Sequence, residues 1–235
     1  LKQQLRLTVQ LSVPAIIAQL SSIIMQYIDA AMVGSLGAEA SASVGLVATT
    51  TWLFWGLCVA AATGFSVQVA HRIGANDMKG ARMVLRQSLA ATLIFSLLLA
   101  ALGAVISPSL PGWLGGDISI RRDASIYFFI FSLFLPVLQM NFLAGGMLRC
   151  SGNMHIPSLM GVIMCILDVI FNFFLIFPVR ECCVAGVSFT IPGAGLGVSG
   201  AALGTAAAEI VAAGVLLWYL LAHSEKLKHV REEGN

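Results

Sequence analysis

Hydrophobic residues of this chain gather in six long stretches, and short segments rich in glycine, proline or charge separate them. A helix needs about 20 mostly apolar residues to cross a bilayer, and each stretch meets that length. The pattern predicts six membrane-spanning helices, at about residues 8–33, 43–68, 84–107, 125–148, 156–178 and 197–222. We therefore expect an all-α polytopic membrane protein, with a six-helix bundle over residues 1–223 and a charged cytoplasmic tail or linker over residues 224–235.

The composition supports a membrane location. Hydrophobic residues make up 58% of the 235 residues and charged residues 10%, whereas a soluble domain carries roughly a quarter charged residues. The formal net charge of +2 comes from basic residues scattered over several connections, and they form no basic stripe. The sequence thus predicts the lipid bilayer as a partner and excludes nucleic acid.

The basic residues also indicate the orientation. Six spans place both termini on one side, and that side carries ten of the thirteen Lys and Arg residues, while the other side carries Arg121, Arg122 and Arg180. Loops that stay in the cytoplasm are enriched in Lys and Arg. We expect a multi-pass protein of the plasma (inner) membrane with both termini in the cytoplasm.

The first span carries a polar stripe. Its polar residues are separated by 7, 3, 4 and 3 positions, which is the spacing of one helix face, and they are Ser12, Gln19, Ser22, Gln26 and Asp29. The opposite face, with Ile16, Leu20, Ile24 and Tyr27, can meet lipid. Neighbouring helices can satisfy serines and glutamines, but a carboxylate needs a partner, a proton or water. Because this polar face is not expected to meet lipid, Gln19, Ser22 and Gln26 are candidate cavity-lining residues.

Pro14 lies fifteen residues before Asp29 on the same predicted helix. Proline lacks an N–H and clashes with the carbonyl four residues earlier, so it kinks a helix. The kink is either static packing or a place where the helix bends.

Three acids lie inside predicted spans: Asp29, Asp168 and Glu209. An ionisable residue at the centre of a spanning helix costs roughly 2.5 to 3.5 kcal/mol on insertion scales, so such residues usually face a bundle interior and have a function. Asp168 and Asn172 are four residues apart and share a face, and Asn172 is a candidate cavity-lining residue. Glu209 follows Thr205 by one turn, and either joins the same polar interior or lies toward the cytoplasmic end.

In the fourth span, Asn141 is a candidate lining residue, whereas Arg149 at its cytoplasmic end is expected to anchor the helix at the interface. The five cysteines show no metal-ligand spacing, and we predict no metal cluster and no cofactor. The adjacent Cys182 and Cys183 lie in an outer loop, residues 179–196, to which the sequence assigns no role.

Two further segments have competing interpretations. "HRIGANDMKGARMVLRQS" after the second span is either a solvated charged loop or a short interfacial helix that leads into the third. "GLGVSG" at residues 195–200 matches the dinucleotide fingerprint, but that motif works only after a strand in a βαβ unit, and no strand is expected here. Small residues at 200, 204 and 208 instead predict close packing of the sixth helix.

Several motifs, in order along the chain, resemble the amino-terminal half of the multidrug and toxic compound extrusion (MATE) transporters. They are "VPAIIAQLSSIIMQYIDAAMVGSLG", "RIGANDMKGAR", "GGMLRCSGNMHIPSL", "CILDVIFNFFLIF" and "GVSGAALGTAAAEIV". The resemblance implies a twelve-helix carrier of two six-helix lobes, not an enzyme, which exports amphipathic or cationic drug-like compounds by antiport with H⁺ or Na⁺.

Carried over residue by residue, the resemblance implies that Asp29 and Asp168 bind the coupling ion and that the first helix bends at Pro14. Asn141 and Thr205 match polar positions beside the acids. Met164 stands where many members have asparagine, which removes a possible Na⁺ ligand and favours protons. Six spans are half of such a carrier, so we expect a second six-helix lobe, on the same chain if this one is a fragment.

Two other classes of function remain as alternatives. Two carboxylates on different spans are also found in intramembrane aspartyl proteases, but the glycine-flanked signature of those enzymes does not surround Asp168. A passive channel predicts conductance without ion coupling, and the polar stripe is compatible with it.

Overall fold

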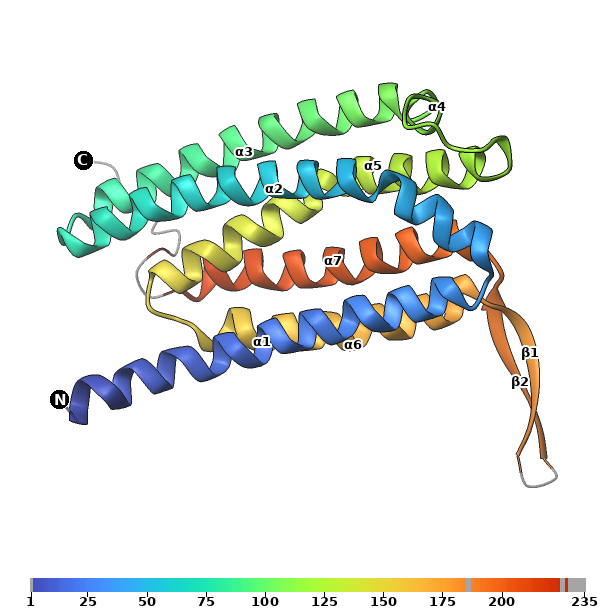
Figure 1. Ribbon diagram of the computed structural model, residues 1–235. Helices are drawn as coiled ribbons and strands as arrows, with labels where there is room; N and C mark the ends of the chain where they lie inside the picture. Colours follow the sequence, from blue (N-terminus) through green and yellow to red (C-terminus); the bar gives the residue numbers. More distant parts are fainter. Residues whose placement is uncertain (1, 185–186, 225–226, 228–235) are drawn as a thin grey trace.

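The computed structural model describes residues 2–184, 187–224 and 227, and it contains the six long helices that the hydrophobic pattern predicts (Figure 1). They are α1 (Lys2–Gly34), α2 (Ala38–Gly74), α3 (Met78–Ile106), α5 (Ile118–Cys150), α6 (His155–Ile176) and α7 (Gly197–Ala222). A single-turn helix, α4 (Leu110–Trp113), lies between α3 and α5 and was not predicted. The all-α membrane fold is thus confirmed.

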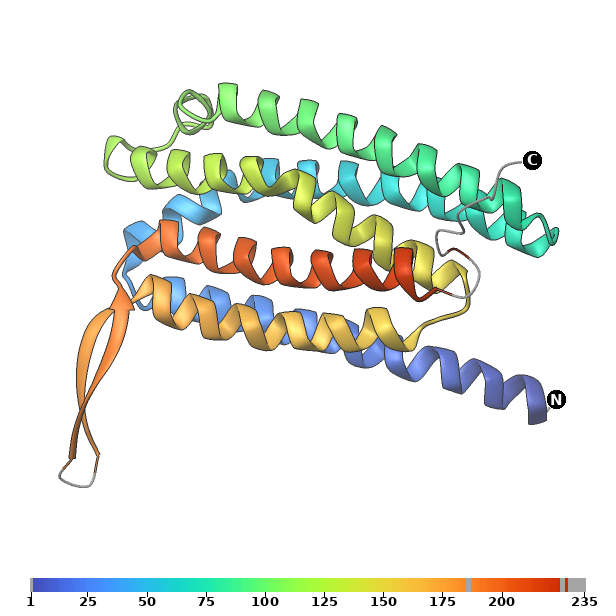
Figure 2. The same ribbon diagram turned by 180° about the vertical axis from the view of Figure 1, so that it is seen from behind.

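The helices form two packed groups. Helices α2, α3 and α5 pack on one another, as do α1, α6 and α7, and the contact of α5 with α7 joins the groups (Figures 1 and 2). Helix α1 touches α6 extensively and α2 and α7 much less. The start of α1 and the end of α7 lie at the same end of the bundle (Figure 1), as an even number of spans requires.

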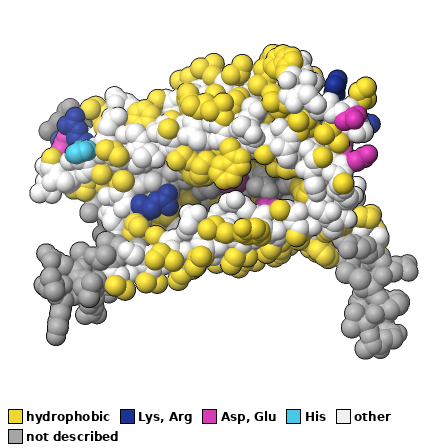
Figure 3. Space-filling model, viewed as in Figure 1, with side chains coloured by type: hydrophobic (Ala, Val, Ile, Leu, Met, Phe, Trp, Pro, Cys, Tyr) yellow, Lys and Arg dark blue, Asp and Glu magenta, His cyan; other side chains and the backbone are white. Residues whose placement is uncertain are grey.

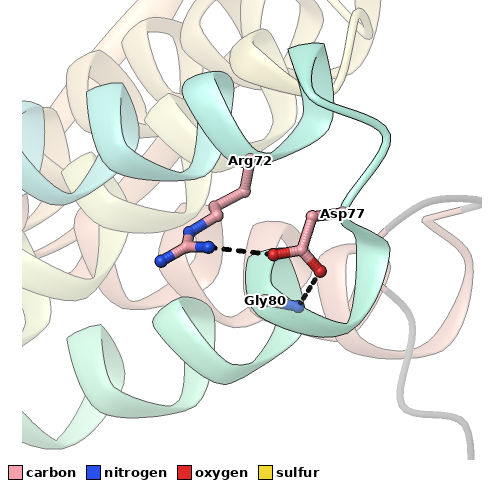
Figure 4. Close-up of polar contacts among 3 residues, drawn as sticks. All are labelled: Arg72, Asp77 and Gly80. Carbon is pink, nitrogen blue, oxygen red and sulfur yellow. Dashed lines mark hydrogen bonds and ion pairs between the residues drawn. The ribbon is translucent and has the colours of Figure 1, made fainter.

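Most helices extend beyond their predicted limits, and the connection between α2 and α3 shows why. Residues 71–88, which we expected to be an interfacial helix or a charged loop, instead form the end of α2, a turn at residues 75–77 and the start of α3. Helix α3 begins at Met78 and continues without a break. Asp77 caps this helix by accepting a hydrogen bond from the Gly80 N–H at 2.8 Å (Figure 4). Hydrophobicity alone misses these polar first turns because capping, rather than lipid contact, specifies them.

Arg72 forms an ion pair with Asp77 at 3.0 Å across the same turn (Figure 4). The Gly80 N–H, and then the Arg72 guanidinium, hold the pKa of the Asp77 carboxyl below its ordinary value. The charged form of Asp77 therefore supports the turn that links the two helices.

Helix α1 runs unbroken through Pro14. The face predicted to meet lipid is exposed in the isolated chain, with exposed fractions of 56% for Ile16, 54% for Leu20 and 75% for Tyr27. Bending at Pro14 stays a prediction.

Residues 179–196 contain a β-hairpin where we expected a loop. Strand β1 (Pro178–Val184) pairs with β2 (Val187–Ala194) in antiparallel register, and the hairpin projects from the end of the bundle where α6 stops (Figure 1). The expectation that no strand precedes "GLGVSG" was therefore wrong, since "VSFTI" alternates in the manner of a strand. A two-stranded antiparallel hairpin is still no βαβ unit, so the dinucleotide interpretation fails.

Close packing between α6 and α7 explains two glycines of that region. A Cβ atom added at Gly200 would lie 2.5 Å from the Leu175 carbonyl oxygen, and one added at Gly204 would collide with the side-chain oxygen of Asn172. These glycines let the two backbones approach, as the repeat of small residues predicts.

Candidate functional site

A cavity of about 630 Å³ opens between the two helix groups. Helices α1, α2, α5, α6 and α7 all contribute to its walls. On the face of the molecule in Figure 3 the surface is hollowed, and acidic side chains are visible inside the hollow. An interior carboxylate in contact with open space is unusual in a membrane bundle, so the cavity is the candidate site.

The polar stripe of α1 faces this cavity. Gln19, Ser22, Gln26 and Asp29 line it, whereas Ser12, the first member of the predicted stripe, is not among the lining residues. The period of the stripe thus locates the cavity wall, because residues three and four apart share a helix face.

Asp29, Asp168 and Asn172 form one hydrogen-bonded group, which we call the two-aspartate cluster. The Asn172 Nδ2 donates to Asp29 Oδ1 at 2.9 Å and to Asp168 Oδ2 at 3.1 Å. The side-chain amide of Asn172 thus links the Asp29 carboxylate of α1 to the Asp168 carboxylate of α6. The structure brings together the two acids that the sequence marks as ion-binding candidates.

The two acids differ in burial. Asp168 and Asn172 have exposed fractions of 0%, and within the described residues neither Asp168 Oδ1 nor Asn172 Oδ1 has a hydrogen-bond partner. Asp29 lines the cavity, and Thr205 of α7 both lines it and approaches the Asp168 carboxylate. Asn172 does not line the cavity as we expected, because its amide is held between the acids instead.

Glu209 lies one turn beyond Thr205 on α7 and is 9% exposed. Its Oε2 accepts a hydrogen bond from Asn141 Nδ2 of α5, and the same amide nitrogen lies 3.8 Å from Met164 Sδ. Glu209 and Asn141 both line the cavity. Of the two placements that the sequence allowed for Glu209, the structure shows the one in the polar interior.

Arg149 lines the cavity near the end of α5, although we expected it to anchor the helix at the membrane interface. It follows Asn141 by eight residues, which is about 12 Å along the helix axis. The cavity therefore carries a guanidinium toward the end where α1 begins, and the acids Glu209 and Asp29 lie farther from that end.

Sequence analysis missed the aromatic part of the wall. The lining includes six aromatic side chains from α2 and α5, namely Trp52, Trp55, Tyr127, Phe131, Phe134 and Phe142. Trp55 packs edge-to-face on Phe142 with ring centroids 5.5 Å apart. From sequence alone, an aromatic residue in a membrane span can face either lipid or the protein interior. Only the packing of α2 against α5 shows that these six side chains face the cavity.

The donor set does not suggest a metal cluster. Among the described residues no three His, Cys, Asp or Glu side chains are placed to hold a metal ion, and Cys58, Cys150 and Cys165 are free thiols. The side chains of Cys182 and Cys183 lie outside the described part of the structure.

Comparisons with known proteins agree with this picture. The MatE family model matches residues 14–174. The FAD transporter of Shewanella oneidensis is 24% identical over 177 residues, which cover 74% of this chain and 38% of the relative.

Solved structures share the fold. The crystal structure of MATE in complex with MaL6 superimposes with a TM-score of 0.84 at 24% identity, covering 95% of this chain and 46% of the other. An outward-facing multidrug resistance MATE family transporter of the MOP superfamily superimposes with a TM-score of 0.79 at 24% identity, covering 95% of this chain and 46% of the other. This chain spans less than half the length of each of the three proteins.

Proposed function

The chain belongs to the MatE family of membrane transporters, and from that premise we propose that it forms one lobe of a secondary exporter that exchanges protons for amphipathic or cationic compounds. Members of this family are transporters, not enzymes, which leaves the aspartyl protease interpretation without support. The direction, the driving ion and the cargo are parts of the proposal.

The position of Asp29 is the single observation that carries the proposal. One of its oxygens accepts from Asn172 inside the two-aspartate cluster, and the same side chain lines the cavity. A proton at the cluster and an organic cation in the cavity would therefore compete for one negative charge. Such competition is what an antiporter requires.

The exchange cycle follows from electrostatics. With Asp29 and Asp168 ionised the cavity is anionic and attracts a cationic compound; protonation from outside removes that attraction and releases the compound. A change of charge also alters the contacts of α1 with α6, and Pro14 is where we propose that α1 bends. Each net charge moved gains about 2.3 kcal/mol per 100 mV of membrane potential, equivalent to roughly fifty-fold in concentration.

The same proposal includes a partner lobe. Inverted or parallel repeats of helices enclose the substrate site in many carriers, and this chain covers 46% of the solved MATE structure that it matches with a TM-score of 0.84. We propose a second six-helix lobe facing the cavity, and an orientation in the inner membrane with both termini cytoplasmic, as the distribution of Lys and Arg predicts.

The orientation of the Asn172 side-chain amide favours protons over sodium as the coupling ion. Sodium prefers oxygen ligands, but Met164 offers none and Asn172 presents its Nδ2 to both acids. A rotation of the Asn172 amide by half a turn would offer Oδ1 instead. Sodium therefore remains the alternative to be tested.

FAD, the cargo in the name of the Shewanella oneidensis relative, is a second candidate substrate. The aromatic wall can stack on a flavin ring, and Arg149 is placed to meet a phosphate. The acids Asp29 and Glu209 oppose an anionic ligand in the same cavity. We therefore rank FAD below cationic compounds.

Transport from vesicles separates these possibilities. The protein expressed from its complete gene is reconstituted, and efflux of ethidium or of FAD is followed under an imposed pH gradient and, separately, under an imposed sodium gradient. Ethidium movement driven by the pH gradient and lost in Asp29→Asn supports the proposal. Flux that runs downhill only, whatever ion gradient is imposed, identifies a channel and contradicts it.

A further inference from the structure

We propose that Glu209, held by Asn141, binds the cationic group of the transported compound, whereas the two-aspartate cluster binds the coupling ion. This division of labour rests on the proposed exporter function and adds a substrate-binding residue to it.

The hydrogen bonding of Glu209 leaves half of its carboxylate available. Asn141 donates to Oε2, and within the described residues no donor reaches Oε1. The side chain is 9% exposed and what it exposes lies in the cavity wall. A largely buried carboxylate with an oxygen free toward a cavity is a site for a cation.

The surroundings of Glu209 suit an organic cation better than a bare ion. The lining residues within one helical turn of Glu209, or of Asn141 and Met164 beside it, are mostly apolar or aromatic: they include Leu138, Phe142, Met160 and Ala212, and Thr205 is the polar exception. Aromatic faces attract ammonium and phosphonium groups, and apolar side chains cover the attached carbon groups. A small hydrated ion would find no second carboxylate and only one amide there.

The two-aspartate cluster has the opposite character. Asp168 and Asn172 are fully buried behind the cavity wall, so a drug-sized molecule cannot reach them without opening the contact between α1 and α6. Asp168 Oδ1 and Asn172 Oδ1 are buried and have no hydrogen-bond partner within the described residues, so a proton or a small ion would satisfy them. Only Asp29 belongs to both the cluster and the cavity.

The spacing allows the two sites to communicate. Thr205 approaches Asp168, and Glu209 follows Thr205 by four residues, or about 6 Å along α7. The charged groups that line the cavity are Asp29 from α1, Arg149 from α5 and Glu209 from α7, and α2 contributes none. A cation at Glu209 is thus attracted by Asp29 when the cluster is ionised and not when it is protonated.

Binding measurements with matched probes test this assignment. Tetraphenylphosphonium carries a permanent positive charge, and triphenylphosphine oxide has a similar aromatic shell without one. Both are titrated into the full carrier in lipid nanodiscs, for the wild type and for Glu209→Gln, Glu209→Asp and the control Glu39→Gln, which changes an exposed acid at the start of α2. Size-exclusion profiles verify that each variant is folded.

We expect Glu209→Gln to weaken tetraphenylphosphonium binding about ten-fold or more, equivalent to 1.4 kcal/mol, with triphenylphosphine oxide binding unchanged within about two-fold. Glu209→Asp should retain part of the preference for the cation, and Glu39→Gln all of it. Asp168→Asn should reduce displacement of bound tetraphenylphosphonium by acid, because one proton-binding group of the cluster is lost while Asp29 and Glu209 remain, and it should leave binding near neutral pH within a few-fold.

Equal weakening of both probes by Glu209→Gln, or no weakening of either, overturns the assignment. If the wild type exports tetraphenylphosphonium while Glu209→Gln binds it unchanged, Glu209 is not the cation site and the exporter proposal stands. If the wild type neither binds nor exports any organic cation, both proposals fall.

Discussion

Interior polar side chains of the two helix groups form their hydrogen bonds in different ways. In α2, α3 and α5 the buried hydroxyls bond within their own helices: Ser66 donates to the Ala62 carbonyl at 2.8 Å, Thr92 to that of Ser88 at 2.6 Å and Ser132 to that of Phe128 at 2.8 Å. The interior carboxylates of α1, α6 and α7 instead depend on amides: Asn172 of α6 donates to Asp29 of α1, and Asn141 of α5 donates to Glu209 of α7.

This difference distinguishes polar side chains that only stabilise the fold from polar side chains that we propose take part in transport. A hydroxyl that returns to its own backbone is satisfied whatever its neighbours do, so it contributes to packing and can be replaced. A carboxylate that depends on an amide in another helix links two elements, and its charge can change their relative position. The following variants test that distinction, beginning with the largest expected effect.

Removing a charge from the two-aspartate cluster should abolish transport. Asp29→Asn and Asp168→Asn each keep the shape of the side chain but remove the group that exchanges a proton for a cation, so we expect ethidium efflux to fall about a hundred-fold or more, equivalent to roughly 2.7 kcal/mol. Efflux from cells with quantified expression measures this. The matched change in the other helix group is Thr92→Val, which should remain within about two-fold of the wild type.

Gly204→Ala should damage the same cluster without changing any charge. The added Cβ collides with the side-chain oxygen of Asn172 and lies 3.0 Å from its backbone nitrogen. Because the backbone of α6 limits how far Asn172 can withdraw, we expect efflux to fall about ten-fold, or 1.4 kcal/mol.

Gly214→Ala in the same helix is the control for that variant, since a Cβ there meets nothing within 4 Å. Alanine favours a helix over glycine by about 0.8 to 1.0 kcal/mol, so this variant should transport normally and be no less stable. Equal efflux from the two glycine variants would remove the assigned role of Asn172.

Gly103→Ala should affect stability in the α2, α3 and α5 group rather than transport. The added Cβ collides with the Ser132 hydroxyl and lies 3.1 Å from a ring carbon of Phe54. Overpacking of this kind costs about 1 to 3 kcal/mol, and thermal unfolding in detergent measures it. Gly56→Ala, where the new Cβ meets nothing within 4 Å, is the control; a specific transport defect in folded Gly103→Ala would contradict the comparison.

Asp77→Ala should give a small effect, because its hydrogen bond and ion pair lie within one solvent-exposed turn between α2 and α3. The pKa of Asp77 is lowered, first by the Gly80 N–H and then by Arg72, so its contribution to folding is present above its ordinary pKa of about 3.9 and is lost as the pH falls through the lowered value. Asp77→Ala should unfold at a slightly lower temperature at neutral pH and converge with the wild type in acid.

Arg72→Ala, which removes the ion pair but keeps the cap, should reduce the unfolding temperature less than Asp77→Ala, and neither variant should alter efflux. A difference from wild type that grows in acid would contradict the sign of this linkage.

The sequence predicted the six spans because each is long and apolar, and it predicted the α1 wall because Gln19, Ser22, Gln26 and Asp29 repeat with the helical period. It failed where specificity comes from packing. The hairpin at 178–194 is too short and too mixed to stand out beside helices of 22 residues and more, and the first turns of α3 are set by the Asp77 cap.

The candidate site shows the same limit. The acids stood out as ionisable residues in apolar spans, but no periodicity within α6 or α7 reveals that Asn172 reaches Asp29 or that Asn141 reaches Glu209. Those partners are 143 and 68 residues apart in sequence, so only the packing of the helices brings them together. The role of Gly204 beside Asn172 was hidden for the same reason.

Proton release on ligand binding tests the central claim most directly. Tetraphenylphosphonium is added to the full carrier in weakly buffered solution near neutral pH, and the change of pH is recorded with an indicator dye. The exchange mechanism predicts that the wild type releases protons as the cation binds, and that the Asp29→Asn, Asp168→Asn double variant releases none. Saturable binding to the wild type without any proton release, in the presence and absence of sodium, would contradict it.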